Sequence, residues 1–285
     1  MPEAVRIDDL VISRATPSEW AAVVEWAAAE GWNPGARDTG AFFAQDPDGF
    51  FLGRVNGEPA SAVSVVNYGS EFAFLGFYLV RPELRGHGFG VATWEAGLKH
   101  AGDRVIGLDG VPAQQDNYRR SGFELAYRSA RFLGVPRLPL PDDTVTALAP
   151  TDFAALLPYD AACGPADRPG FLTVWLTEPG HRVFARIVRG EITGYAVLRP
   201  ARTTLRVGPL FADAPADARQ LLAAVAAHAA GMPLAVDVPL DNAPAVSLMA
   251  EAGLEPSFET ARMYTGPVRP FHRERVYGVT TLELG

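Results

Sequence analysis

The spacing between apolar residues changes along the chain, and each change indicates where a predicted strand or helix begins or ends. Residues 50–55 and 58–67 are apolar runs rich in strand-forming residues, and Asn56-Gly57 separates them. That dipeptide is typical of a tight hairpin turn. Residues 72–80 form a third, almost wholly apolar run that stops near a proline. The pattern predicts a hairpin followed by a long buried strand.

Segments that are predicted to be helical lie before and after these strands. After a predicted opening strand at residues 6–14, Thr16-Pro17-Ser18-Glu19 has the composition of a capping box with proline at the first helical position. We expect this helix to end at Gly31. A second helix is expected at residues 91–101. Helices placed between strand runs indicate an α/β fold.

The first half closes with four shorter predicted elements. They are a strand at residues 104–109, a helix ending near Ser121, and a pair of strands between residues 123 and 133. A segment with prolines at 136, 139 and 141 follows, and it reads as a semi-rigid linker. We therefore predict domains at residues 1–135 and 148–285, joined by residues 136–147.

The second half repeats the order of the first. Asp109 and Asp237 each follow an apolar strand, and Gly122-Phe123 corresponds to Gly253-Leu254. Ala130-Arg131 corresponds to Ala261-Arg262. Matching segments lie 128 to 133 residues apart and occur in the same order, which favours a second copy of one fold.

A glycine-rich turn follows the long strand and begins the next helix. It contains Arg85 and glycines at 86, 88 and 90. Such a turn leaves several backbone N–H groups unpaired and pointing the same way, which suits a phosphate or pyrophosphate. Neither the dinucleotide fingerprint nor the Walker loop matches, because Val91 stands where the former needs glycine and no Gly-Lys-Ser/Thr triplet follows.

This turn, Arg85-x-x-Gly88-x-Gly90 after Val80-Arg81-Pro82, resembles the pyrophosphate-binding motif of the GNAT superfamily of acyl-CoA-dependent N-acyltransferases. The resemblance implies two tandem GNAT-like domains, each with a mixed, mostly antiparallel sheet flanked by helices. Residues 150–285 also resemble the C-terminal half of YitH-type acetyltransferases. The acetyl-CoA-binding residues that the resemblance implies are Tyr78, Leu79, Val80, Arg85, Gly86, His87, Gly88, Phe89, Gly90 and Val91.

Two residues carry the predicted chemistry. Tyr118 stands four residues before Gly122-Phe123, where the resemblance implies a general acid aimed at the thioester sulfur; otherwise it packs or touches the pantetheine arm. Asp109, at the end of a strand, is either a general base or a structural group such as a helix cap. Glu71 is a less favoured base, and no base is needed if the amine arrives unprotonated.

The two halves differ at these positions. The counterpart of the glycine-rich turn, residues 207–213, has one glycine, a proline, an acid and no arginine. Met249 replaces the tyrosine, and it has no proton to give. We therefore expect the first half to bind the cofactor and the second to be degenerate.

Composition and charge exclude several classes of protein. The net charge of −8 divides equally between residues 1–140 and 141–285, so neither half offers a basic surface for nucleic acid. No apolar run reaches the ~20 residues of a membrane span, and residues 1–9 lack the apolar core of a secretion signal. Cys163 is the sole cysteine, so a cytoplasmic location is expected. No spacing predicts a metal site.

The sequence thus predicts an acetyl-CoA-dependent N-acetyltransferase acting on a primary amine, either a small molecule or a protein lysine or N-terminus. The alternative is a non-catalytic module that binds acyl-CoA and regulates the second half. We expect a monomer that forms an internal pseudo-dimer, or a homodimer.

Overall fold

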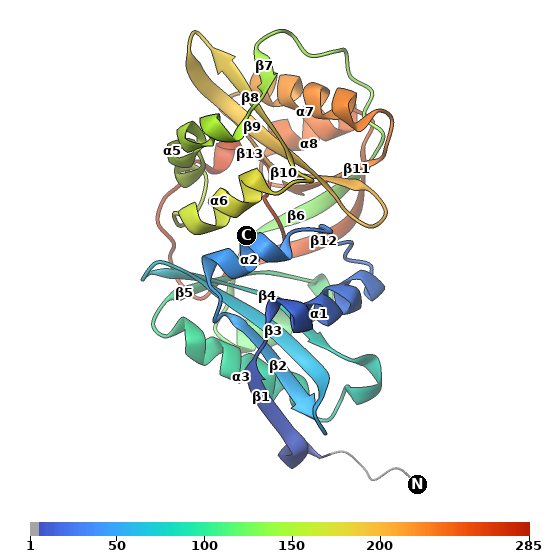
Figure 1. Cartoon of the computed structure of the whole chain (residues 1–285), viewed down its shortest axis with the longest axis vertical. Helices are drawn as coiled ribbons and strands as arrows, with labels where there is room; N and C mark the ends of the chain where they lie inside the picture. The colour runs from blue at the N-terminus through green and yellow to red at the C-terminus, as the bar shows by residue number, and fades with distance from the viewer. Residues whose placement is uncertain (1–5) are drawn as a thin grey trace.

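A computed structural model describes residues 6–285 and contains one continuous 13-stranded sheet within that range (Figure 1). The first half contributes β1 (Leu10–Arg14), β2 (Phe50–Val55), β3 (Glu58–Tyr68), β4 (Phe72–Val80), β5 (Val105–Gly110) and β6 (Glu124–Gly134). Its helices are α1 (Pro17–Ala29), α2 (Thr39–Gln45), α3 (Phe89–Ala101) and α4 (Gln115–Arg120).

The second half repeats this arrangement, which confirms the internal repeat. Its strands are β7 (Val145–Ala147), β8 (Arg182–Val188), β9 (Glu191–Pro200), β10 (Leu205–Ala212), β11 (Leu234–Pro239), β12 (Glu255–Tyr264) and β13 (Val276–Gly278). Its helices are α5 (Leu156–Ala162), α6 (Pro169–Thr177), α7 (Pro215–Ala229) and α8 (Ala243–Glu251).

The halves exchange their last long strands. The order through the sheet is β1-β2-β3-β4-β5-β12-β6-β11-β10-β9-β8-β7. Strand β12 of the second half therefore pairs with β5 of the first, and β6 of the first pairs with β11 of the second. Strands β6 and β12 pair with each other at the centre of the molecule, as Figure 1 shows. The exchange joins the two halves into one sheet, and the predicted limits at residues 135 and 148 stay a prediction.

Two sequence predictions need correction. Residues 123–133 do not form two strands, because β6 is a single strand whose neighbours on both sides come from the second half. The opening strand starts at Leu10 instead of residue 6, because residues 7–9 form a turn of 3₁₀ helix. The hairpin at Asn56-Gly57 is confirmed, with both residues in the left-handed conformation that a tight turn needs.

Helices cover both faces of the sheet. On one face α1, α2, α5 and α6 share an aromatic core that crosses the boundary between the halves. Phe42 of α2, for example, stacks on Trp175 of α6 with ring centroids 6.5 Å apart. On the other face, α3 and α4 pack on the first half and α7 and α8 on the second. No helix within residues 6–285 combines the length and the apolar character that crossing a membrane requires.

Candidate active site

The candidate site opens where two parallel strands part. Strands β4 and β5 pair from Phe72 with Val105 to Leu75 with Leu108, and no pairing continues toward Val80. A cleft of about 370 Å³ begins at that point. Tyr78 and Val80 line its β4 side, and Asp109 lines its β5 side. The parting of the strands thus creates a slot along the carboxyl end of β4.

A bulge in β4 changes which side chains face the cleft. Phe72 and Phe74 pack into the core beneath α1 and α2, as alternation requires. Phe77 joins the same core with a left-handed φ of 47°, so the alternation shifts by one residue. Tyr78 consequently turns to the opposite face, where its ring lies 5.0 Å from that of Trp94 in α3. The register with β3 also shifts here, as a bulge requires.

The glycine-rich turn lies next to the cleft, which it lines through Arg85. Gly86 and Gly88 have φ values of 85° and 82°, and Gly88 caps α3. Among residues 6–285, no acceptor is bonded to the amide N–H groups of residues 86–91. A Cβ on Gly90 would lie 2.7 Å from the Tyr78 hydroxyl oxygen, so only glycine lets α3 approach β4 this closely. The structure therefore presents a row of free amides at a helix N-terminus, where residues 86–88 and 91 are exposed and Phe89 and Gly90 are buried.

The predicted residues of this turn play different parts. Arg85 lines the cleft, where its Nε donates to the Val80 carbonyl over 3.1 Å and its guanidinium pairs with Glu30. His87 is exposed and stacks on Phe89, whose own ring is buried. Phe89 and Val91 can offer only backbone groups as hydrogen-bond donors at the turn, because neither side chain carries a polar atom.

Tyr118 lies in the cleft between the turn and β5. Its ring stacks on Trp94 with centroids 5.7 Å apart, and its edge fills the space above Gly110, where a Cβ would collide with it. Burial raises the pKa of Tyr118 to about 12. The phenol is therefore fully protonated at neutral pH, as a proton donor must be.

Asp109 is bound by an arginine from the other half. The Nε and Nη2 atoms of Arg262 on β12 donate to its two carboxylate oxygens over 2.9 and 2.6 Å. Both side chains are buried. Burial raises the pKa of Asp109, and the Arg262 charge opposes the rise. Asp109 is one of the residues that line the cleft, but its carboxylate is fully buried and ties the exchanged strand to β5.

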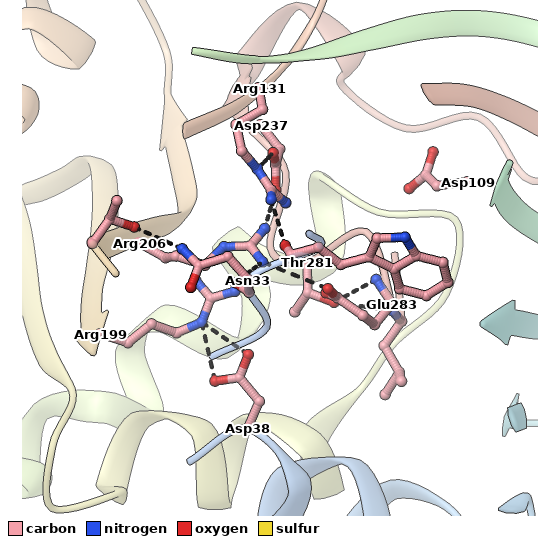
Figure 2. Close-up of polar contacts among 12 residues, drawn as sticks. Asn33, Asp38, Asp109, Arg131, Arg199, Arg206, Asp237, Thr281 and Glu283 are labelled. Carbon is pink, nitrogen blue, oxygen red and sulfur yellow. Dashed lines mark hydrogen bonds and ion pairs between the residues drawn. The ribbon is translucent and has the colours of Figure 1, made fainter. Parts of the chain in front are cut away.

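The inner wall of the cleft comes from a buried charge network that sequence reasoning missed (Figure 2). Arg131 of β6 binds Asp237 through its Nε over 2.7 Å and donates to the Trp32 carbonyl over 2.5 Å. Arg206 also pairs with Asp237, and these two arginines hold the pKa of Asp237 below its usual range although burial opposes ionisation. The cleft residues that sequence reasoning missed include Gln114, Arg131, Phe258, Thr260 and Glu283.

In the second half, the chain itself fills the corresponding slot. Strands β10 and β11 pair in parallel only from Leu205 to Val207. Beyond that, β13 pairs with β10, with Leu210 opposite Gly278, and Val279 donates to the Asp237 carbonyl over 2.8 Å. Met249, the counterpart of Tyr118, is fully buried. The slot between the two parallel strands is therefore open in the first half, whereas β13 fills it in the second half.

The structure thus brings Tyr78, Leu79, Val80, Arg85, Asp109 and Tyr118 to one cleft. The other predicted residues of the turn, Gly86, His87, Gly88, Phe89, Gly90 and Val91, do not line the cleft, but Gly90 lies against Tyr78 and Val80. Glu71 is exposed and does not line the cleft. Cys163 is buried away from the cleft, and burial raises the pKa of its thiol, so it has no character of a nucleophile there. Within residues 6–285, no cluster of His, Cys, Asp and Glu could hold a metal ion.

In a comparison with known protein families, each half of the chain has its own match. The acetyltransferase (GNAT) family matches residues 18–123, and the acetyltransferase (GNAT) domain matches residues 156–278. Holothin acyltransferase of Pseudoalteromonas sp. (strain SANK 73390) is 34% identical over 274 residues, which cover 95% of this chain and 93% of that protein.

Solved structures share the fold over nearly the whole chain. A putative acetyltransferase from Pyrococcus horikoshii has a TM-score of 0.85 at 19% identity, covering 100% of this chain and 99% of its own. A tandem GNAT protein from the clavulanic acid biosynthesis pathway has a TM-score of 0.59 at 18% identity, covering 90% and 99%. These likenesses support the tandem fold.

Proposed function

Because the chain belongs to the GNAT family of acyltransferases, we propose that it transfers an acetyl group from acetyl-CoA to a primary amine. The family implies acyl-CoA as the co-substrate. The observation that supports the proposal is one cleft lined by the end of β4, Arg85 and Tyr118. The free amides of residues 86–91 directly follow Arg85, and Gly90 packs against Tyr78 and Val80 of the cleft. The second half would act as a structural partner, with its own slot filled by β13.

The residues at the turn fit the pyrophosphate of coenzyme A. Free N–H groups at a helix N-terminus are good donors to an anion, and hydrogen bonds to charged groups contribute about 1.5–3 kcal/mol each. The helix dipole adds only ~0.3–1 kcal/mol, so the amides should dominate. Arg85 would supply a further cation. Its exposed pair with Glu30 is of a kind worth about 0–1 kcal/mol, so it can be exchanged for a phosphate.

The bulged end of β4 suits the acyl-bearing arm. Residues 78–80 border the slot, and a backbone N–H from this stretch would polarise the thioester carbonyl as an oxyanion hole does. Tyr118 would protonate the departing sulfur of coenzyme A. Asp109 serves in this proposal to hold β12, because Arg262 already occupies both of its oxygens.

The acceptor would bind on the side of the cleft that the second half borders. Thr260, Phe258 and Glu283 border the cleft there. A wall built by the second half favours a small amine over a lysine on a folded protein. The homologous holothin acyltransferase acts, by its name, on holothin, and we extend to this chain only the transfer of an acyl group to an amine. We also propose a cytoplasmic protein whose two halves form an internal pseudo-dimer.

The test is an assay of free coenzyme A release from acetyl-CoA. The acceptor panel would contain tyramine, tryptamine, spermidine, lysine ethyl ester and a short peptide with a free N-terminus, with products identified by mass. We expect an acetylated amine product and turnover above acetyl-CoA hydrolysis. Coenzyme A binding without turnover across the panel would instead favour a non-catalytic acyl-CoA-binding module.

A further inference from the structure

Two buried polar atoms on the wall of the cleft have no partner. They are Oε2 of Glu283 and Oγ1 of Thr260, and no hydrogen bond reaches either one within residues 6–285. Their residues are only 4% and 3% exposed, and both line the cleft. Because buried polar groups in proteins are nearly always hydrogen-bonded, such a pair points to a bound ligand.

Both residues come from the half that lacks a binding slot. Thr260 lies on the exchanged strand β12, and Glu283 lies in the segment that follows β13. The Thr281 hydroxyl accepts from the amides of Glu283 and Leu284 over 2.9 and 3.0 Å and so forms a turn at this point. The Glu283 carbonyl oxygen lies against Gly76 of β4, where a Cβ would collide with it. The segment that closes one slot therefore continues into the other.

Glu283 belongs to a buried network of charged side chains. Arg131, Arg199 and Arg206 share this network with the carboxyl groups of Asp38, Asp237 and Glu283, so it contains three basic and three acidic side chains (Figure 2). Oε1 of Glu283 lies 3.5 Å from Nη1 of Arg206. One oxygen thus faces the network, and the other stays free to accept a hydrogen bond from a ligand.

We propose that Glu283 and Thr260 bind the amine of the acceptor. A carboxylate oxygen and a hydroxyl oxygen can each accept an N–H bond, which matches the several donors of a primary amine or ammonium group. An anionic acceptor would be repelled by Glu283. This inference rests on the proposed function. In the transfer step the amine nitrogen bonds to the acetyl carbon, the carbon–sulfur bond breaks, Tyr118 protonates the sulfur, and Glu283 takes the amine proton.

The variant Thr260→Val tests the site without disturbing the fold. It replaces an unpartnered hydroxyl by a methyl group, so the free energy of unfolding should not fall. The KM for the best amine of the panel should rise about 3- to 10-fold, and the KM for acetyl-CoA should stay the same. Ser129→Ala is the matched control. Ser129 faces Thr260 across β6 and β12, and its hydroxyl is also buried and unpartnered, but it does not line the cleft.

The variant Glu283→Gln should lower kcat/KM for the amine about 10- to 100-fold, with Glu283→Asp retaining more activity than Glu283→Gln. Coenzyme A titration would be run on every variant. An unchanged amine KM in both Thr260→Val and Glu283→Gln would overturn the amine site while leaving the acetyltransferase intact. If the wild-type protein acetylates no amine of the panel, the proposed function fails, and this site fails with it.

Discussion

Asp109 and Arg262 stand opposite each other in the antiparallel register of β5 and β12, although 153 residues separate them in sequence. Asp237 and Arg131 repeat this relationship between β11 and β6. Each exchanged strand therefore carries one arginine that binds an aspartate of the other half. The two buried ion pairs fix the register of both exchanged strands.

Arg262→Met should destabilise the protein by about 3–5 kcal/mol, because it leaves the Asp109 carboxylate buried without its partner. The double variant Asp109→Leu/Arg262→Met should lose much less stability, since it removes both charges. Urea unfolding of the single and double variants measures this difference. If Asp109 only holds β12, the double variant keeps turnover within about tenfold of wild type. A loss of 100-fold or more would identify Asp109 as the general base.

Cutting the linker should not separate the halves. A protease site inserted at Leu140, which is 83% exposed, would leave β6 held between β12 and β11. Size-exclusion chromatography of the cut protein should give one native peak containing both fragments, which part only in urea. Two folded fragments that elute separately in native buffer would contradict the strand exchange.

Stability should fall between pH 7 and pH 5 because of His181. Burial and the nearby Arg199 charge lower the pKa of His181 to about 4, and its Nδ1 lies 2.8 Å from the Trp175 carbonyl oxygen. The unfolded chain, with a histidine pKa near 6.5, binds more protons over this range, so acid favours unfolding. The stabilisation is complete above about pH 6.5 and is lost progressively as the pH falls toward 4.

We expect a loss of about 2 kcal/mol in the free energy of unfolding from pH 7 to pH 5. Urea titrations at both pH values measure it. His181→Gln should remove most of this pH dependence, and His228→Gln should keep it, because His228 is exposed. Equal pH dependence in wild type and His181→Gln would refute the assignment.

Tyr118→Phe should reduce kcat about 100-fold and leave the affinity for coenzyme A unchanged. Within residues 6–285 no hydrogen bond holds the Tyr118 hydroxyl, so its loss should not affect folding. Because the pKa of Tyr118 is raised to about 12, kcat should show no alkaline decline from this group below about pH 10. Assays of coenzyme A release at a series of pH values test both the loss of kcat and its pH dependence, and Tyr127→Phe is the control. Full activity in Tyr118→Phe would remove its role as the acid.

Local signals in the sequence predicted much of this molecule. The turn at Asn56-Gly57, the strand before Val80 and the glycine-rich turn follow from short-range chemistry, and the repeat follows from matched segments such as those around Arg131 and Arg262. The exchange of β6 and β12 could not be predicted in the same way. An apolar strand has the same pattern whether it pairs within its own half or with the other.

The proposed acceptor side of the cleft could not be predicted for a related reason. Thr260 and Glu283 lie far in sequence from the turn at residues 85–91, and only the sheet order brings them near it. The bulge at Phe77 could not be predicted either, because a run that is apolar at every position does not show which side chain changes to the other face of the sheet. The resemblance over residues 150–285 includes Glu283 but assigns it no chemistry, because that chemistry depends on where the segment lies in the fold.

The central claim is that the free amides of residues 86–91 in the first half bind the pyrophosphate of coenzyme A, and that the second half has no such site. Isothermal titration of coenzyme A tests it with the variants Gly88→Asp and Gly231→Asp. Both glycines have φ values near 80°, at 82° and 85°, and Gly231 lies in an open turn after α7, so the two variants carry equal backbone strain. Wild type and Gly231→Asp should bind one coenzyme A per chain with the same affinity, and Gly88→Asp should bind at least about 100-fold more weakly. Wild-type affinity in Gly88→Asp, or two equivalent sites per chain, would contradict the account.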